Sequence, residues 1–379
     1  MAINFKPETV FFLRVFAPLW QKNHREDIVA KIDKLFKILK ERKGSDLHIS
    51  VGAPPLIRLS GDLTPVTNVV LPQEETKKLL YEIMTPFMQQ RFEEIKEVDF
   101  AYALDGIGRF RANVFMQQRG IAAVFRIIPE RIMTVEELKV PTQTLNFAKL
   151  HRGLVLVTGP TGSGKSTTLA ALIDYINATR SDHIITIEDP IEFVHQNKKC
   201  LVNQRELHAH TDSFGAALRS ALRQDPDVIL VGEMRDQETI QLAMTAAETG
   251  HLVYGTLHTN SAHKTIDRII DVFPSAQQGQ IRSMLSESLK GVLAQTLLKK
   301  IGGGRCAAIE ILVGTPAIAN LIREAKTFQI PSVLQTSKNE GMQTLDMALV
   351  ELYQKKMITA DDCIGYSADK KTVSAQIGH

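Results

Sequence analysis

The chain has 379 residues, of which 44% are hydrophobic, so it can bury at least one large core. Domains usually hold about 100 to 200 residues, which favours two of them here. The formal net charge of +3 is too small to indicate a nucleic acid or an anionic membrane as partner. Three widely separated cysteines give neither a disulfide framework nor a paired metal motif, which fits the reducing cytoplasm.

Residues 1–26 are expected to form an N-terminal extension outside the folded domains. Residues 10–20 are apolar and aromatic, but Arg14 and Pro18 interrupt them and no small-residue cleavage site follows. A signal peptide is therefore not indicated, and no apolar run approaches the roughly 20 residues of a spanning helix. A loosely packed extension is the favoured interpretation, and a docking segment for a membrane surface or a partner is the alternative.

Residues 27–135 predict an α+β domain in which a sheet is combined with two helices. Apolar residues recur at helical spacing over residues 27–42, and a second helical stretch covers residues 74–96. The intervening and following segments read as short strands, punctuated by glycine and proline. These strands are expected at residues 47–51, 55–59, 63–70, 98–104, 110–117 and 121–128.

Residues 136–379 predict a RecA-like α/β domain with a helical C-terminal part. The boundary is expected near residue 135, because periodicity weakens over residues 129–152 and two prolines punctuate them. Apolar strands then alternate with helical segments, the pattern of a parallel sheet covered by helices. The strands are expected at residues 154–158, 184–187, 228–231 and 252–257. After about residue 275 the chain is predicted to be mainly helical, with one apolar run at 307–313.

Residues 159–166 match the pattern G-x-x-x-x-G-K-[ST], with an apolar strand before them and a helical segment after them. Glycines let backbone N–H groups turn toward phosphates, Lys165 can reach the β- and γ-phosphates, and the Ser166 hydroxyl can ligate Mg²⁺. The residues predicted to hold the nucleotide are Gly159, Thr161, Gly162, Ser163, Gly164, Lys165, Ser166 and Thr167. ATP and Mg²⁺ are the cofactors that this loop predicts.

Two acidic groups follow apolar strands of the same predicted sheet. Gly232 replaces the aspartate that usually ends the second of these strands, so Glu233 becomes the candidate to polarise the attacking water. Glu188 and Glu192 lie in the other group, where they are expected to bind nucleotide and Mg²⁺. Mg²⁺ keeps several waters, so Glu192 and Glu233 are expected to act partly through water. Asp189, before Pro190, is equally well explained as a turn former.

Two histidines and two arginines complete the candidate site. His258 follows the predicted strand at residues 252–257 and could sense the γ-phosphate, whereas His251 precedes that strand. A histidine near a strand end is more often structural. Arg111 and Arg126 come from adjacent predicted strands of the N-terminal domain. They either cover a solvated face or reach a neighbouring subunit's nucleotide and stabilise charge on the transferring phosphate.

Four of these stretches together resemble the secretion ATPase superfamily, whose corresponding segments are called the Walker A, Asp box, Walker B and His box. They are residues 159–167, 188–192, 232–236 and 256–260. Three further segments resemble the type IV pilus retraction ATPases within that superfamily, namely residues 45–48, 317–324 and 341–346. The resemblance covers about residues 27 to 350.

The resemblance implies a homo-hexameric ring with a PAS-like N-terminal domain and a nucleotide site that arginines of the neighbouring subunit complete. It implies a catalytic role for Glu233, an acidic support role for Glu192, and His box roles for His258 and His251. Arg111 and Arg126 become the implied arginines. It also implies a cytoplasmic motor, peripheral at the inner membrane, that drives a platform protein there and acts indirectly on pilin. Neither nucleic-acid binding nor stable lipid insertion is expected.

One position departs from the retraction signature, which usually has arginine where this chain has Ala319. Assembly and type II secretion ATPases of the superfamily typically carry four cysteines in a zinc-binding insertion, and this chain lacks them. A retraction motor is therefore the favoured interpretation. The alternatives are a pilus assembly or secretion ATPase, another RecA-like motor that moves nucleic acid, and a nucleotide-gated scaffold with little turnover.

Overall fold

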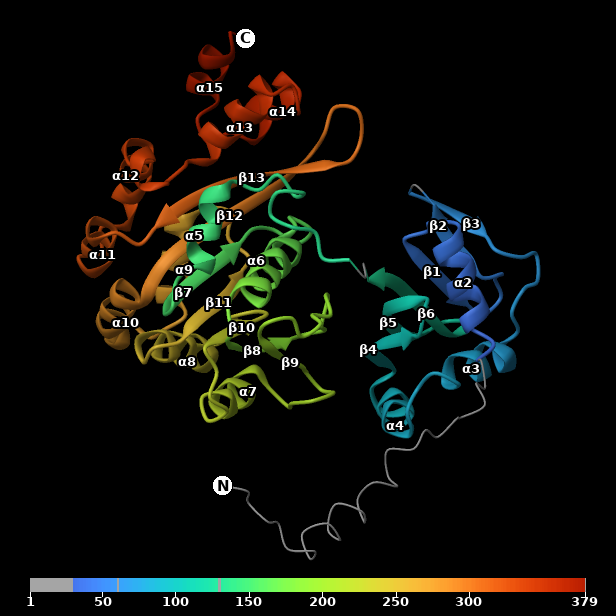
Figure 1. The fold of residues 1–379 in the computed structure, drawn as a ribbon. Helices are drawn as coiled ribbons and strands as arrows, with labels where there is room; N and C mark the ends of the chain where they lie inside the picture. The colour runs from blue at the N-terminus through green and yellow to red at the C-terminus, as the bar shows by residue number, and fades with distance from the viewer. Residues whose placement is uncertain (1–29, 60, 129–130, 379) are drawn as a thin grey trace, which may run out of the picture. The chain divides into compact units, whose positions relative to one another are not determined.

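A computed structural model describes residues 30–59, 61–128 and 131–378. The chain divides into two compact units, Met1–Ile127 and Ile128–His379 (Figure 1). The boundary therefore lies earlier than the predicted residue 135. Strand β6 continues to Ile128, and Val135 and Val140 are already buried in the core of the second unit. The predicted extension over residues 1–26 lies outside the described residues.

The first unit contains a six-stranded sheet with the strand order β3-β2-β1-β6-β5-β4. Strand β1 runs antiparallel to both β2 and β6. The strands are β1 (Asp46–Ser50), β2 (Leu56–Leu59), β3 (Asp62–Pro65), β4 (Glu97–Leu104), β5 (Gly108–Gln117) and β6 (Gly120–Ile128). Phe36 packs against this sheet, with its ring 4.2 Å from that of Phe110 and 5.1 Å from that of Phe125. The predicted α+β organisation is confirmed.

This unit contains three described α-helices rather than the two that were predicted. They are α2 (Asp33–Glu41), α3 (Gln73–Tyr81) and α4 (Pro86–Ile95). The expected continuous stretch over residues 74–96 is broken at Pro86, which lacks the N–H that a helix interior requires. Thr85 instead caps a new helix, since its Oγ1 accepts a hydrogen bond from Met88 N at 3.3 Å.

The second unit contains a seven-stranded sheet with the order β13-β12-β7-β11-β10-β8-β9. Five neighbouring pairs are parallel and only β12 and β13 run antiparallel. The strands are β7 (Gly153–Thr158), β8 (His183–Glu188), β9 (Leu201–Glu206), β10 (Val228–Val231), β11 (Leu252–Leu257), β12 (Leu289–Lys299) and β13 (Arg305–Val313). All four predicted strands are present, and the RecA-like α/β class is confirmed.

The prediction of a mainly helical chain after residue 275 is wrong for β12. This strand is buried along most of its length, so its apolar residues follow neither the helical nor the alternating strand period. Its pairing with β7 on one side and β13 on the other decides its structure. Strand β9 at the sheet edge was also not predicted.

Helices cover both faces of this sheet, and each face has its own buried core (Figure 1). The described helices are α5 (Leu145–Ala148), α6 (Lys165–Thr179), α7 (Phe214–Ala221), α8 (Gln237–Glu248), α9 (Ala262–Asp271), α10 (Ser275–Ser288), α11 (Pro316–Arg323), α12 (Ile330–Thr336), α13 (Leu345–Gln354), α14 (Ala360–Tyr366) and α15 (Lys370–Ile377). Cys306 of the hairpin β12–β13 and Cys363 of α14 lie in a smaller core that joins the last helices to the hairpin.

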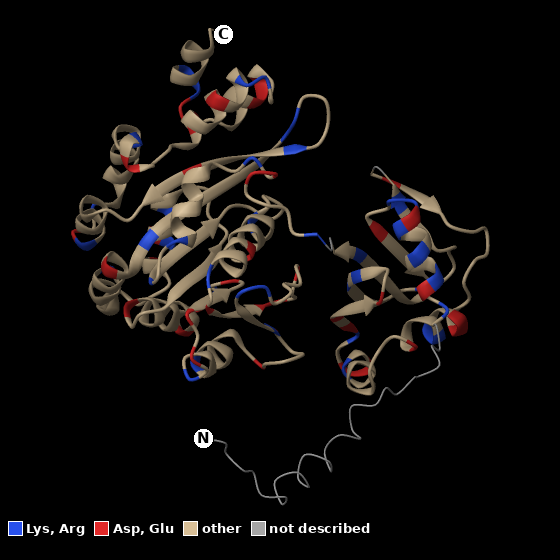
Figure 2. Cartoon of the chain, viewed as in Figure 1, with Lys and Arg blue, Asp and Glu red and all other residues tan. Residues whose placement is uncertain are grey.

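Acidic and basic residues both occur in each unit (Figure 2). This mixture agrees with the small net charge of the chain. Among the described residues, no helix is both long enough and apolar enough to cross a membrane.

Candidate active site

The glycine-rich loop lies at the carboxyl end of the central strand β7 and leads directly into α6. Strand β7 ends at Thr158 and α6 begins at Lys165, so the loop places backbone N–H groups and the positive end of a helix at one point. Gly159 is required there by space as well as by its φ of 144°. A Cβ at this position would lie 2.2 Å from Gln295 O and 2.5 Å from Ser163 Oγ. The predicted loop therefore has the geometry of an anion-binding turn.

Gln295 of β12 holds this loop from the neighbouring strand. Its Nε2 donates to Ser163 O at 2.7 Å, and its Oε1 accepts from Thr168 Oγ1 at 2.8 Å. Gln295 is buried, so both hydrogen bonds lie in a dry environment where their loss is costly. Sequence analysis missed this residue because β12 was not predicted, and no local motif marks it.

Lys165 lies inside the loop with two acidic residues near it. Its Nζ donates to Gly159 O at 2.9 Å and to Pro160 O at 3.1 Å. Burial lowers the pKa of Lys165, while the negative charges of Glu233 and Glu192 act in the opposite direction. Both carboxylates are therefore near enough to Lys165 for their charges to act on it.

Gly232 stands where the usual strand-terminal aspartate would be, and the backbone is closely packed around it. Its N–H donates to Ile187 O at 2.7 Å, which draws the chain after β10 against β8. A Cβ at residue 232 would lie 3.0 Å from Ile187 O and 3.2 Å from Glu188 Cα. Thr256 Oγ1 also donates to Gly232 O. A side chain at residue 232 would therefore be tightly packed, and the first carboxylate after β10 is that of Glu233.

The carboxylate of Glu233 is held by two neighbouring side chains. Its Oε1 lies 2.5 Å from Arg235 Nε and 3.0 Å from His258 Nε2. His258 follows β11 and reaches Glu233 across the carboxyl edge of the sheet. The hydrogen bond that Arg235 donates to Glu233 raises the pKa of Arg235. His258 thus belongs to the same cluster as the predicted catalytic carboxylate.

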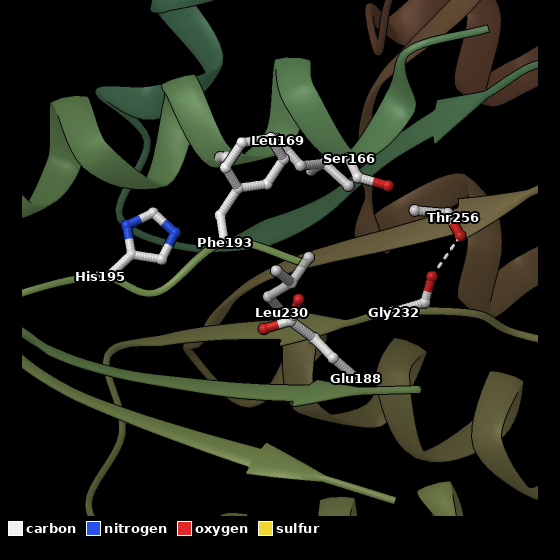
Figure 3. A pocket seen from close by; sticks show the side chains of 9 residues that line it. Ser166, Leu169, Glu188, Phe193, His195, Leu230, Gly232 and Thr256 are labelled. Carbon is white, nitrogen blue, oxygen red and sulfur yellow. Dashed lines mark hydrogen bonds between the residues drawn. The ribbon is translucent and has the colours of Figure 1, made fainter. Parts of the chain in front are cut away.

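A small cavity lies beside Ser166 and extends below the start of α6 (Figure 3). Figure 3 shows Ser166 and Leu169 of α6 on one side of it and Glu188 on the other. Glu188 accepts hydrogen bonds from Thr186 Oγ1 at 2.7 Å and Gln204 Nε2 at 3.2 Å. Burial raises the pKa of Glu188, although these two hydrogen bonds oppose that shift.

His195 lines the same cavity and was not predicted. It is buried, and burial lowers its pKa to about 4, so the ring is neutral at pH 7. Glu192 and Asp189 lie on the chain between Glu188 and His195, and both are exposed. No motif distinguishes His195, and its proximity to Ser166 results from the path of the chain after β8.

His251 does not reach this cluster within one chain. It precedes Leu252, which pairs with Gly153 at the start of β7, whereas the phosphate-binding loop follows the end of β7. Strand β11 has six residues, so the two edges are about 20 Å apart. The His251 ring instead contacts Ala246 O through Nδ1 at 3.0 Å. Its predicted nucleotide-binding role is not supported by this placement.

Arg111 and Arg126 belong to the first unit and come from neighbouring strands β5 and β6, as expected. Arg111 is exposed. Arg126 Nε lies 2.8 Å from Asp46 Oδ1, and its side chain is still 73% exposed. Burial opposes ionisation of Asp46, but hydrogen bonds from Ser45 and Arg126 together lower its pKa. Asp46 therefore holds Arg126 at its Nε, while most of the Arg126 side chain faces solvent.

The residues near the loop fit a bound Mg²⁺. Ser166 offers a hydroxyl at the start of α6, and the acidic side chains near Lys165 can act through water. Mg²⁺ in phosphate sites takes one or two protein ligands and keeps several waters, which this donor set allows.

Comparison with known proteins identifies the family. The family described as type II/IV secretion system protein matches residues 107–308. A type IV pilus retraction ATPase of Pseudomonas aeruginosa, PilT, is 57% identical over 331 residues, which are 87% of this chain and 96% of PilT. A twitching motility protein of Neisseria gonorrhoeae is 56% identical over 308 residues, 81% of this chain and 82% of that one.

The fold is also similar to a solved structure of the pilus retraction motor PilT with bound ADP. The TM-score is 0.83 at 50% identity, and the match covers 89% of this chain and 98% of that chain. Sequence identity at this level and coverage of nearly the whole relative leave no ambiguity about ancestry. The chain therefore belongs to the type II/IV secretion system protein family and, within it, to the type IV pilus retraction ATPases.

Proposed function

We propose that this chain hydrolyses ATP in the presence of Mg²⁺ and uses the energy to retract type IV pili. The observation that carries this proposal is the cluster of Lys165, Glu192, Glu233 and His258 at the carboxyl edge of the sheet. The 57% identity to a pilus retraction ATPase supplies the biological context.

Each residue of the cluster has a role that its position supports. Backbone N–H groups of the loop and the Lys165 ammonium bind the β- and γ-phosphates. Ser166 would hold Mg²⁺ directly, with Glu192 and Glu233 contributing through water. When bound, Mg²⁺ would neutralise charge on the triphosphate oxygens. Glu233 orients the attacking water and accepts its proton, and His258 positions the Glu233 carboxylate.

The site becomes complete in a homo-hexamer. Arg111 and Arg126 of one subunit would reach the nucleotide of the next and stabilise charge on the transferring phosphoryl group. Hydrolysis would change the angle between the two units, and the ring would transmit that motion to a platform protein of the inner membrane. Pilin would be affected indirectly. The motor would stay cytoplasmic and associate with the membrane only at its periphery.

Complementation of a pilus-bearing bacterium that lacks its own retraction ATPase tests this function. The wild-type chain should restore twitching on agar, whereas Glu233→Gln should not. Exposed Glu238 provides a matched control, because Glu238→Gln removes a carboxylate from the nearby surface and should still restore twitching. Mg-dependent ATPase activity without restored twitching would instead favour an assembly or secretion motor.

A further inference from the structure

Helix α4 of the first unit carries an exposed apolar stripe beside the face that packs into the core. Buried Phe92 marks the core face. Phe87 and Ile95 are 64% and 58% exposed. With Arg91 between them they recur at every fourth residue, so the three lie along one side of the helix over about 12 Å. Arg91 is half-buried, and its hydrocarbon stem adds apolar surface between the two apolar side chains.

Met116 of β5 extends this stripe beyond the end of α4. Its N–H donates to Lys96 O at 2.9 Å, and Lys96 directly follows α4. Side chains alternate between the two faces of a sheet, and Phe110 and Val114 of β5 are buried in the same core as Phe92. Met116 is in phase with them, so its side chain lies on the face that α4 covers, where it is 45% exposed. Scattered apolar side chains are ordinary on a surface, whereas a contiguous set of them usually marks a binding site. We call Phe87, Arg91, Ile95 and Met116 the α4 stripe.

Residues 10–20 are a second apolar feature, and they precede the described part of the chain. They combine aromatic with aliphatic side chains and contain a single charge, that of Arg14. Leaving so much apolar surface in water is unfavourable. The resemblance to the secretion ATPases begins only at about residue 27, so this segment lies outside it. Its aromatic side chains are Phe11, Phe12, Phe16 and Trp20.

The described chain starts close to the start of α4. Lys31 N donates to Glu82 Oε2 at 3.1 Å. Glu82 directly follows α3, and the chain from Glu82 to Phe87 spans at most about 18 Å. From Trp20 to Lys31 the chain spans up to about 36 Å, so residues 10–20 can reach the α4 stripe of their own chain. A segment on so short a tether has an effective concentration in the millimolar range, which favours it over free partners.

The charge beside the α4 stripe complements the charge of the segment. Arg14 interrupts the apolar run, and burying its charge without a partner is costly. Glu94 of α4 is exposed and lies two helical turns after Phe87, so it borders the stripe. Its carboxylate accepts a hydrogen bond from Gln90 Nε2 at 3.1 Å, and this neutral amide leaves the negative charge in place. Docking would therefore put the one cation of the segment beside a carboxylate.

We propose that residues 10–20 dock on the α4 stripe of the same chain, with their aromatic side chains against Phe87, Ile95 and Met116. Arg14 would lie beside Glu94. The stripe would then be occupied and unavailable to a membrane or to another protein. This inference does not depend on the proposed ATPase activity.

Fluorescence of Trp20 in the intact chain tests the docking, because Trp20 is the only tryptophan. Acrylamide should quench it less in the folded chain than in the chain unfolded in urea, and its emission should lie at shorter wavelength. Phe87→Ser and Ile95→Ser should each move both quantities toward the unfolded values, and the double variant should move them further. Both side chains are largely exposed, so the variants should keep the circular dichroism of wild type.

Phe328→Ser is the matched control, because Phe328 is a phenylalanine of the second unit that is 71% exposed. It should leave the quenching and emission of Trp20 unchanged. Wild-type Trp20 that is quenched as strongly as in urea would overturn the proposal, and so would shielding that the Phe87 and Ile95 variants keep. Shielding that arises only when phosphatidylglycerol vesicles are added would overturn it as well, and would assign the segment to a membrane.

Subunit exchange distinguishes the stripe of the same chain from that of a second copy. Wild type is mixed with an excess of a chain that carries Trp20→Phe, Phe87→Ser and Ile95→Ser, which has neither the tryptophan nor the intact stripe. Docking within one chain predicts that Trp20 of the wild type stays shielded in the mixture. Exposure of Trp20 as neighbouring copies are replaced would show that a second copy provides the stripe, and would overturn the proposal.

Discussion

The carboxylate of Glu233 is held by two neighbouring side chains. Arg235 and His258 both contact its Oε1. A general base must come within hydrogen-bond reach of the water it activates. The second carboxylate oxygen of Glu233 would be able to contact that water, and so would Oε1 once Arg235 moves away.

Glu233→Gln should reduce kcat by about 10²-fold or more, because glutamine cannot accept the proton of the attacking water. ATP binding should persist, since the loop amides and Lys165 are unchanged. Steady-state ATPase assays and equilibrium dialysis measure the two effects separately, with Glu238→Gln as the control. A variant that lost binding and turnover equally would indicate a structural role for Glu233.

Glu188 should make the stability of the protein depend on pH. Burial raises its folded-state pKa above the ordinary value of 4.5, so the folded protein retains a proton that the unfolded chain releases. This contribution to the free energy of unfolding is present below pH 4.5 and is lost as pH rises through the folded-state pKa.

Replacing Glu188 by glutamine removes this titration while keeping an oxygen that can accept from Thr186 and Gln204. Relative to wild type, the variant should therefore gain stability as pH increases above 4.5. Urea unfolding at a series of pH values measures the difference. A constant difference between wild type and Glu188→Gln across that range would exclude the proposed titration.

Residue motifs predicted which side chains lie at the carboxyl edge of the sheet, but they did not identify every residue there. The loop, Glu233 and His258 follow the carboxyl ends of parallel strands, so their meeting at one edge was predictable. His251 lies at the other end of β11. His251 and His258 were assigned to one sequence motif, but a whole strand separates them in space. Gln295 and His195 reach the site only through tertiary contacts, for which the sequence has no local signal.

At the scale of elements, β12 is the support of the phosphate-binding loop. It pairs in parallel with β7, and Gln295 from it contacts both the loop and α6. Its nearly continuous burial removed the alternation that would have identified it as a strand. The helix break at Pro86 was marked more clearly, by a proline that follows a capping threonine.

Gln295→Leu should destabilise the second unit and weaken ATP binding together. Leucine leaves Ser163 O and Thr168 Oγ1 without their buried partner, at a cost of about 1–3 kcal/mol in the free energy of unfolding. Urea unfolding and ATP dialysis measure the two quantities. Gln280→Leu is the control, since Gln280 is exposed on α10 and lies on the same unit. Unchanged stability in Gln295→Leu would mean that the loop does not depend on this strand.

At the scale of the whole molecule, the proposed catalytic groups belong to two different units. Glu233 and the phosphate-binding loop lie in the second, and Arg111 and Arg126 in the first. Asp46 holds Arg126 at its Nε and leaves the rest of the side chain exposed. The spacing of Arg111 and Arg126 in the sequence is compatible with either a solvent-exposed strand face or a nucleotide site shared between subunits. The similarity to the retraction ATPases favours the shared site. A shared site makes hydrolysis depend on assembly.

Mixing two inactive variants tests the shared site most directly. Glu233→Gln and Arg111→Ala should each be nearly inactive in Mg-dependent ATP hydrolysis, and the activity of wild type should rise with protein concentration as rings form. Mixed rings bring the intact Glu233 of one variant against the intact Arg111 of the other, so the mixture should recover measurable activity. Mixtures that stay inactive, or an Arg111→Ala chain that hydrolyses ATP like wild type at every concentration, would contradict the account.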